Sequence, residues 1–385
     1  MRHLAYGREQ NESGGRDPDA ETRNLDTLKN PEDPRAPALP LPVLVLGLAV
    51  LLALIVKLCG AEPREALYAL VRGAGGSAEA WGVTLARAAV LALSGLAIAL
   101  SFRAGLFNIG AEGQFLLGAL AAAAVGTKIL PQGVPGFVGV PVLLLAGAAG
   151  GAAWSLLAGV LREWRGISEV ISTLMLNLLA AILIKYLVSY KVFLQDPDPL
   201  TNEPKSAYLP DGAQLAGWGG TAFHAGVFII LPAAALLYVL IHHTRAGLAL
   251  RATGLNESAA RACGIPVARV RLLVFFFSGA LAGLGGAMAM LADGRLGSAL
   301  YPEYGYMAIA VALVAGLHPL GVLPAALFFA LLESGAKAME RDAAVPSQVV
   351  FLVQGLVILA LLMRGVHLPG QRRATGAAAE VGRES

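Results

Sequence analysis

Residues 90–114 read VLALSGLAIALSFRAGLFNIGAEGQ, and this stretch decides the fold class. Its first part belongs to an apolar run over 83–101, close to the roughly 20 helical residues that cross a ~30 Å hydrocarbon core. The glycines that follow, Gly105, Gly110 and Gly113, disfavour an unbroken helix. Backbone groups freed by such a break can face protein or water but never lipid. The stretch therefore predicts a membrane helix followed by an interrupted one.

The composition supports a lipid environment for most of the chain. Of its 385 residues, 56% are hydrophobic and only 14% are charged, whereas soluble domains carry roughly 25% charged residues. Aromatic residues make up 7% and glycine is abundant at 46 residues, which favours close packing of helices over a core of large rings. Cys59 and Cys263 stand in unrelated contexts and predict no structural disulfide.

Apolar runs recur from residue 39 to residue 363. The runs at 305–318 and 320–337 are separated by His318-Pro319 and are expected to form a broken or re-entrant pair. We expect an all-α polytopic bundle of about ten spans with one or more broken or re-entrant helices. The expected spans are 39–59, 83–101, 115–130, 138–161, 168–190, 225–241, 272–292, 305–318, 320–337 and 347–363.

Basic residues gather on one side of the predicted topology. With the N-terminus inside, the loops 102–114, 162–167 and 242–271 are cytoplasmic and rich in arginine, whereas the outside loop 191–224 holds two lysines against four acidic residues. The positive-inside rule then predicts a membrane protein with both termini cytoplasmic. Loop 60–82 runs against the rule, since it carries Arg64 and Arg72 outside. The expected domains are a disordered polar tail (1–37), a transmembrane domain (38–365) with a cytoplasmic segment (243–271), and a C-terminal tail (366–385).

Polar side chains lie where the hydrocarbon midplane is expected. Counted from Arg103 at 1.5 Å per helical residue, Glu112 lies about 13 Å deep, with Asn108 and Gln114 beside it. An ionisable group at this depth is a functional hypothesis. These side chains fit two roles equally: they line a path for a polar solute, or they join helices, with Glu112 paired to Arg103 or neutral.

A second polar group follows in EVISTLMLN, residues 169–177. Glu169, Thr173 and Asn177 share one helix face by their i, i+4, i+8 spacing. Counted from Arg165, Asn177 lies about 18 Å deep. Such a stripe faces either a pathway or a structural contact in the bundle interior, and the spacing does not decide between the two.

A capped helix is expected in the large inside loop. Asn256 is a good N-cap and Gly264 a good terminator, and Pro266 suits the first position of the next helix. A short rigid helix that projects into the cytoplasm is suited to docking a partner, although an ordinary loop helix has the same signals.

Several functions are excluded or disfavoured by motifs the chain lacks. It has no G-x-x-x-x-G-K-[ST] loop for ATP and no H-E-x-x-H motif for zinc. Its six histidines do not cluster with carboxylates at metal spacing. We therefore expect no catalytic residues, no metal site and no cofactor, and nothing points to nucleic acid.

Four segments resemble the permease subunits of bacterial ABC importers for nucleosides and simple sugars, within the branched-chain amino acid and ribose permease superfamily. They are AGLFNIGAEGQ (104–114), EVISTLMLN (169–177), GLNESAARACGI (254–265) and MAIAVALVAGLHPLGVLPAALF (307–328), in collinear order within about 80–365. The first is similar to the nucleoside branch, and the chain looks like its longer permease. The polar N-terminus departs from the family pattern.

The resemblance implies both a mechanism and partners. It implies a transport subunit, not an enzyme, that works with ABC ATPase subunits, a second and shorter permease, and a substrate-binding lipoprotein. It also implies the inner membrane of a bacterial cell. The residues expected to line the pathway are Asn108, Glu112, Gln114, Thr173 and Asn177, from their depth and polarity, together with Phe107 beside Asn108. The implied ATPase contact comprises Gly254, Asn256, Ala259, Ala260, Gly264 and Ile265.

Two other classes stay open from the residues. A proton-coupled secondary transporter has a similar composition and would use Glu112 as its proton site. A membrane-embedded enzyme is the weaker rival, because no catalytic constellation is visible.

Overall fold

The computed structural model describes residues 41–190, 193–196, 204–297 and 303–346, together with 348–349, 351–352 and 354–356. The chain divides into two units, Met1–Leu44 and Val45–Ser385, and the description below concerns the second. The predicted tails 1–37 and 366–385 lie outside the described residues, and so does most of the predicted span 347–363.

The described part is a helical bundle, whose only β-bridges are isolated pairs such as Gln195 with Ser206. Its helices are α2 (Leu41–Leu58), α3 (Pro63–Gly75), α4 (Ala78–Arg103), α5 (Ala111–Lys128), α6 (Gly136–Arg165), α7 (Glu169–Ser189), α8 (Ile230–His243), α9 (Arg245–Leu255), α10 (Glu257–Ala262), α11 (Val267–Asp293), α12 (Tyr304–Val314) and α13 (Pro319–Ala343). Short 3₁₀ turns η1 (Asp211–Ala213), η2 (Trp218–Gly220) and η3 (Ala225–Ile229) lie between α7 and α8.

Six of the described helices are long and apolar enough to cross a membrane: α4, α6, α7, η3 with α8, α11 and α13. This confirms the all-α membrane class predicted from the composition. Helix α12 is apolar but has only 11 residues, so at 1.5 Å per residue it is too short to span ~30 Å alone.

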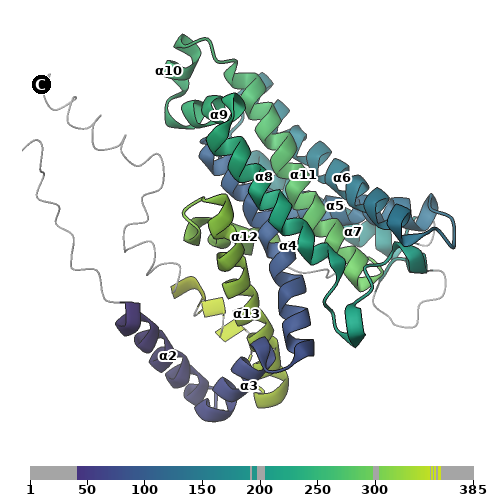
Figure 1. Cartoon of the computed structure of the whole chain (residues 1–385), viewed down its shortest axis with the longest axis vertical. Helices are drawn as coiled ribbons and strands as arrows, with labels where there is room; N and C mark the ends of the chain where they lie inside the picture. The colour runs from purple at the N-terminus through teal and green to yellow at the C-terminus, as the bar shows by residue number, and fades with distance from the viewer. Residues whose placement is uncertain are drawn as a thin grey trace, which may run out of the picture. The chain divides into compact units, whose positions relative to one another are not determined.

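Glycines allow the central helices to approach backbone to backbone. Helix α11 packs against α4, α5 and α6 (Figure 1). A Cβ on Gly118 of α5 would lie 2.3 Å from the Cα of Gly283, and one on Gly151 of α6 would lie 2.3 Å from the carbonyl oxygen of Gly279. No larger residue fits at these crossings, as expected where helices associate by close packing instead of by a hydrophobic effect.

Two helices are interrupted where the sequence predicts a break. Helix α4 ends at Arg103, residues 104–110 are not helical, and α5 begins at Ala111. Helices α12 and α13 are separated by a turn in which Gly316 and Leu317 both adopt positive φ, 59° and 57°. The predicted interruption at the glycines and the predicted break before Pro319 are therefore confirmed.

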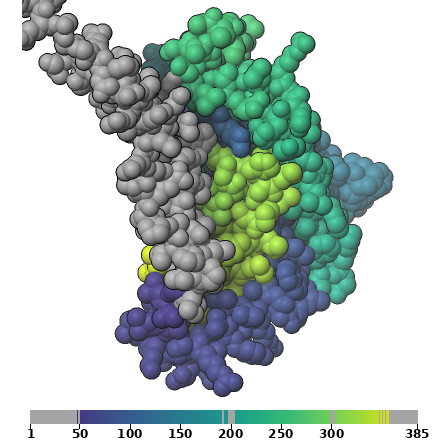
Figure 2. Space-filling model, turned by 60° about the vertical axis from the view of Figure 1, so that its left-hand side comes forward, coloured from purple at the N-terminus to yellow at the C-terminus, as the bar shows by residue number. Residues whose placement is uncertain are grey.

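The two ends of the bundle differ in structure. At one end lie α9 and α10 (Figure 1). Helix α9 packs against the loop after α4, where a Cβ on Gly254 would lie 2.3 Å from the carbonyl oxygen of Arg103. At the other end, the predicted loop 60–82 contains α3, which packs on α13 and α4. Figure 2 shows α12 and α13, in yellow-green, between the green α9–α10 end and the blue segment at the opposite end. From the sequence, 60–82 is expected only as a loop between spans, but its alanines at 66, 69 and 74 form the buried stripe of a helix.

Candidate functional site: a polar junction inside the bundle

Glu112 caps a helix that begins inside the bundle. Its carboxylate accepts hydrogen bonds from the backbone N–H of Gly305 (2.7 Å) and of Glu303 (3.3 Å), at the start of α12. The side chain is buried, and a Cβ on Gly305 would collide with the backbone of residue 112. The first N–H groups of a helix lack partners and carry partial positive charge, so a carboxylate stabilises this end. The pairing of Glu112 with Arg103 that the sequence left open does not form, because the Nε of Arg103 donates to the carbonyl oxygen of Leu317.

Asn108 and Gln114 form a second part of the junction. The amide of Asn108 donates to Oε1 of Gln114 (3.2 Å) and to Oγ of Ser278 (3.0 Å), while its Oδ1 accepts from the Gln114 amide and from the N–H of Gly110, both at 3.0 Å. Ser101 donates to Ser278 at 2.8 Å. All four side chains are buried. The segment 104–110 is thus fixed to α4, α5 and α11 by neutral hydrogen bonds.

Asn177 forms the third part, from α7. Its Oδ1 accepts from the N–H of Gly113 (2.8 Å), and its amide donates to the carbonyl oxygen of Ile109 (2.9 Å) and to the hydroxyl of Tyr306 (3.2 Å). Thr173 instead donates to the carbonyl oxygen of Glu169 in its own helix (2.6 Å). Glu169, Thr173 and Asn177 are all buried, which confirms that they share an inward face.

The structure therefore brings most of the predicted pathway residues together around one broken helix. Asn108, Glu112, Gln114, Thr173 and Asn177 are at most 7% exposed, and each has a hydrogen-bond partner in the protein. Phe107 differs, because it is 57% exposed, with its ring centroid 5.5 Å from that of Phe102. Tyr306, which the sequence did not single out, adds a second exposed ring at 39%. That these residues meet a solute stays a prediction.

The predicted docking helix forms as expected. The side chain of Asn256 accepts from the N–H of Ala259 (3.1 Å) at the start of α10, and Gly264 adopts a φ of 78° after its end. Ala259 is exposed and Ala260 is buried beneath it. Ile265 is half-buried, and its N–H donates to the carbonyl oxygen of Ala260. Pro266 is the N-cap of α11, one position before the predicted one.

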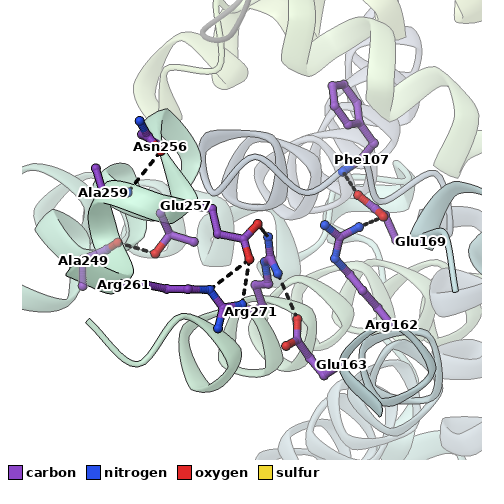
Figure 3. Close-up of polar contacts among 11 residues, drawn as sticks. Phe107, Arg162, Glu163, Glu169, Ala249, Asn256, Glu257, Ala259, Arg261 and Arg271 are labelled. Atoms are coloured by element: carbon purple, nitrogen blue, oxygen red, sulfur yellow. Dashed lines mark hydrogen bonds and ion pairs between the residues drawn. The ribbon is translucent and has the colours of Figure 1, made fainter. Parts of the chain in front are cut away.

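Ion pairs at this end were not predicted (Figure 3). Arg271 of α11 contacts Glu257 of α10 and lies 3.4 Å from Glu163 of α6, and Arg162 pairs with Glu169 of α7. The only available sequence signal was the placement of opposite charges in loops that the topology put on the same side. Among the described residues, no group of three His, Cys, Asp or Glu side chains is placed to hold a metal ion.

Comparison with known proteins places the chain. Residues 82–362 match the family described as branched-chain amino acid transport system / permease component. Over 323 residues the chain is 35% identical to the guanosine ABC transporter permease protein NupP of Bacillus subtilis, covering 83% of this chain and 91% of that one. It is also 35% identical over 288 residues to the glucose ABC transporter permease protein TsgB13 of Haloferax volcanii, covering 72% and 74%.

A further relative is the nucleoside ABC transporter permease protein NupB of Lactococcus lactis subsp. cremoris, 29% identical over 333 residues, with 84% and 90% of the two chains covered. These matches confirm the family resemblance and a transport role instead of an enzymatic one. The chain therefore belongs to the branched-chain amino acid transport permease family, and it is a multi-pass membrane permease subunit of an ABC transporter that works with ATPase subunits.

Proposed function

We propose that the chain forms part of the membrane pathway of an ATP-driven importer for nucleosides. The relatives NupP and NupB, named for guanosine and nucleoside transport, support this substrate class. The observation that carries the proposal is the junction itself, where α12 starts on Glu112 inside the bundle beside the exposed rings of Phe107 and Tyr306. Aromatic faces stack on nucleobases, and amide side chains match ribose and base hydrogen bonds. A simple sugar is the second candidate, favoured by the similarity to TsgB13.

The proposed membrane orientation places α9 and α10 in the cytoplasm of a bacterial cell, with both chain ends inside and the protein in the inner membrane. Arginines on the helix ends and loops at this end support it, as the positive-inside rule requires. They are Arg103, Arg162, Arg165, Arg245, Arg251, Arg261, Arg269 and Arg271.

The proposed assembly contains ATPase subunits docked on α10, a second and shorter permease, and an external substrate-binding lipoprotein. Gly254, Asn256 and Gly264 would shape the dock, with Ala259 and Ile265 on its surface above Ala260. ATP-driven closure would push α10 and rock the helices around the junction. The buried partners of Asn108, Glu112, Gln114, Thr173 and Asn177 would then be exchanged in part for solute as the pathway opens.

Uptake into vesicles tests the substrate class. The full chain, assembled with its ATPase subunits, second permease and binding protein, is supplied with tritiated guanosine or tritiated glucose. We expect ATP-dependent guanosine uptake that drops about tenfold in Phe107→Ala and is retained in Phe107→Tyr, since one base-stacking contact is worth roughly 1–3 kcal/mol. Glucose uptake alone would replace the first candidate by the second. Uptake without ATPase that collapses with the proton gradient would contradict the importer and support the secondary transporter.

A surface variant tests the dock. Ala259→Trp places a bulky ring on the exposed face of α10, and we expect ATPase subunits to co-purify less. Ile129→Trp, at an exposed position after the far end of α5, is the matched control. Equal co-purification in both variants would show that α10 is not the dock.

A further inference from the structure

Arg271 joins three helices at the α9–α10 end of the bundle. It lies on the second turn of α11, and its side chain is 11% exposed. One Nη contacts Glu257 of α10, and the other lies 3.4 Å from Oε1 of Glu163 on α6 (Figure 3). Glu257 also binds Arg261 within α10 at 2.7 Å. A displacement of α10 would therefore pull on both α11 and α6 through the Arg271 side chain.

A second ion pair continues from the same end of α6. Arg162, next to Glu163, pairs with Glu169 on the first turn of α7. Glu169 also accepts a hydrogen bond from the N–H of Phe107 at 3.4 Å. This pair thus connects the end of α6 to α7 and to segment 104–110, which leads into the polar junction (Figure 3).

Burial makes these contacts different from ordinary surface ion pairs. The side chains of Glu163, Glu169 and Arg271 are 8–11% exposed, and that of Arg162 is 24% exposed. Exposed pairs contribute little, but removing one partner of a buried pair leaves an uncompensated charge, and this cost holds the helices in register. Arg269, two residues before Arg271, is exposed and provides a contrast of equal charge on the same helix.

Both arginines keep an unused donor. The Nε of Arg162 and the Nε of Arg271 are buried and have no hydrogen-bond partner. A guanidinium binds a carboxylate most tightly through two parallel N–H groups, so each arginine can form a second arrangement that employs Nε. A pair with two discrete arrangements is what a moving contact between helices needs.

We propose that Glu257, Arg271, Glu163, Arg162 and Glu169 form an ion-pair relay that moves the first turn of α7 and segment 104–110 together with α10. Arg271 and Glu169 are positioning residues: they carry the movement and do not touch the solute. The relay rests on the proposed docking of ATPase subunits at α10, because that contact supplies the movement.

Distance measurement between spin labels tests the relay without knowledge of the solute. Cys263, exposed at the end of α10, carries one label, and Ile171→Cys, exposed on the first turns of α7, carries the other, in a Cys59→Ser background. The full chain is assembled with its ATPase subunits and measured before and after addition of ATP and vanadate. We expect a narrow distance distribution whose maximum stays in place, because α7 follows α10.

Removing one charge should release the two helices from each other. In Arg271→Gln, and separately in Glu169→Gln, we expect the distribution to broaden and its maximum to shift on addition of ATP and vanadate. The control Arg269→Gln should match the unmodified chain. Arg271 and Glu169 share no hydrogen-bond partner, so if they act independently the broadening in the double variant Arg271→Gln/Glu169→Gln should equal the sum of the two single effects. If they belong to one relay, the double variant should be little broader than either single variant.

The outcomes separate the relay from the dock. Additive broadening, or a shift already present in the unmodified chain, would overturn the relay. If addition of ATPase subunits leaves the mobility of the Cys263 label unchanged, the proposed dock at α10 is wrong. In that case, a distance distribution that is broader in Arg271→Gln than in the unmodified chain, measured without nucleotide, still supports the ion-pair link between the helices. If Arg271→Gln does not fold, the single variants Arg162→Glu and Glu169→Arg take its place, and each should broaden the distance distribution. The double variant, in which the two charges are exchanged, should narrow the distribution again. A double variant whose distribution stays broad would count against the relay.

Discussion

The polar junction and the α9–α10 end both hold buried polar side chains, but the partners of these side chains differ between the two regions. In the junction, Asn108, Gln114 and Ser278 exchange neutral hydrogen bonds, and the one carboxylate, Glu112, is bound by backbone N–H groups. At the α9–α10 end, carboxylates such as Glu163 and Glu169 are bound by arginines.

The difference follows the cost of burying charge. A guanidinium far from water carries a desolvation cost that an ion pair offsets only with good geometry, so cations are expected near the membrane surface. A helix N-terminus offers partial positive charge without a side chain to desolvate. The bundle thus uses a helix end in place of a cation for Glu112, and in the proposed pathway a solute would meet no fixed ion pair at this carboxylate.

Removing the Glu112 carboxylate should have the largest effect. In Glu112→Ala the N–H groups of Glu303 and Gly305 lose their acceptor, and the buried N–H of Gly305, left unpaired, costs about 1–3 kcal/mol. We expect ATP-dependent uptake to fall below detection and the melting temperature of the purified chain to drop. Glu112→Gln keeps one carbonyl acceptor, so its uptake and melting temperature should lie between those of Glu112→Ala and those of the unmodified chain.

Two measurements make this result specific to the helix cap. Amide hydrogen exchange at the start of α12 should rise in Glu112→Ala, while exchange in α10 should stay as in the unmodified chain. Unchanged uptake and exchange in Glu112→Ala would show that α12 does not need the carboxylate.

The contact between the two regions is more sensitive to volume than to charge. Gly254 lies against the loop after α4, where an added Cβ would be 2.3 Å from the carbonyl oxygen of Arg103. We expect Gly254→Ala to separate α9 from that loop at a cost of about 1–3 kcal/mol, seen as a lower melting temperature and weaker coupling of ATP hydrolysis to uptake. Gly264→Ala, whose Cβ would meet nothing within 4 Å, should show only the smaller strain of its positive φ. Equal losses in the two variants would argue against the backbone contact.

The sequence predicted an interruption within 101–114, which the structure confines to 104–110, because glycines and polar residues act locally. It also placed Asn177 correctly on an inward face, since the spacing of α7 is regular. The depth of Glu112, in contrast, was counted along a helix, and residues 104–110 are not helical. The capping of α12 joins residues 193 positions apart, and nothing in either segment alone indicates that pairing.

The relay shows the same limit more clearly. Glu257 and Arg261 are four residues apart on a helix, a spacing that predicts their contact. Arg271 and Glu163 are 108 residues apart, and their contact depends on how α11 crosses α6 through facing glycines. Local signals therefore indicate which residues are functional candidates, whereas helix crossings decide which of them meet.

The smallest expected effect is the pH dependence of the exposed end of the relay. Hydrogen bonds from Arg261 and then Arg271 hold the pKa of Glu257 below its usual value of 4.5. A lowered pKa in the folded protein means that the carboxylate stabilises the fold above pH 4.5 and that this contribution is lost as the pH falls through the lowered value. Because the side chain is 38% exposed, we expect this contribution to the free energy of unfolding to be less than about 1 kcal/mol.

The melting temperature of Glu257→Gln should therefore lie slightly below that of the unmodified chain at pH 7 and converge with it in acid. The control Glu62→Gln, an exposed carboxylate before α3, should show no such difference at pH 7, and a gap for Glu257→Gln that widens in acid would contradict the assignment.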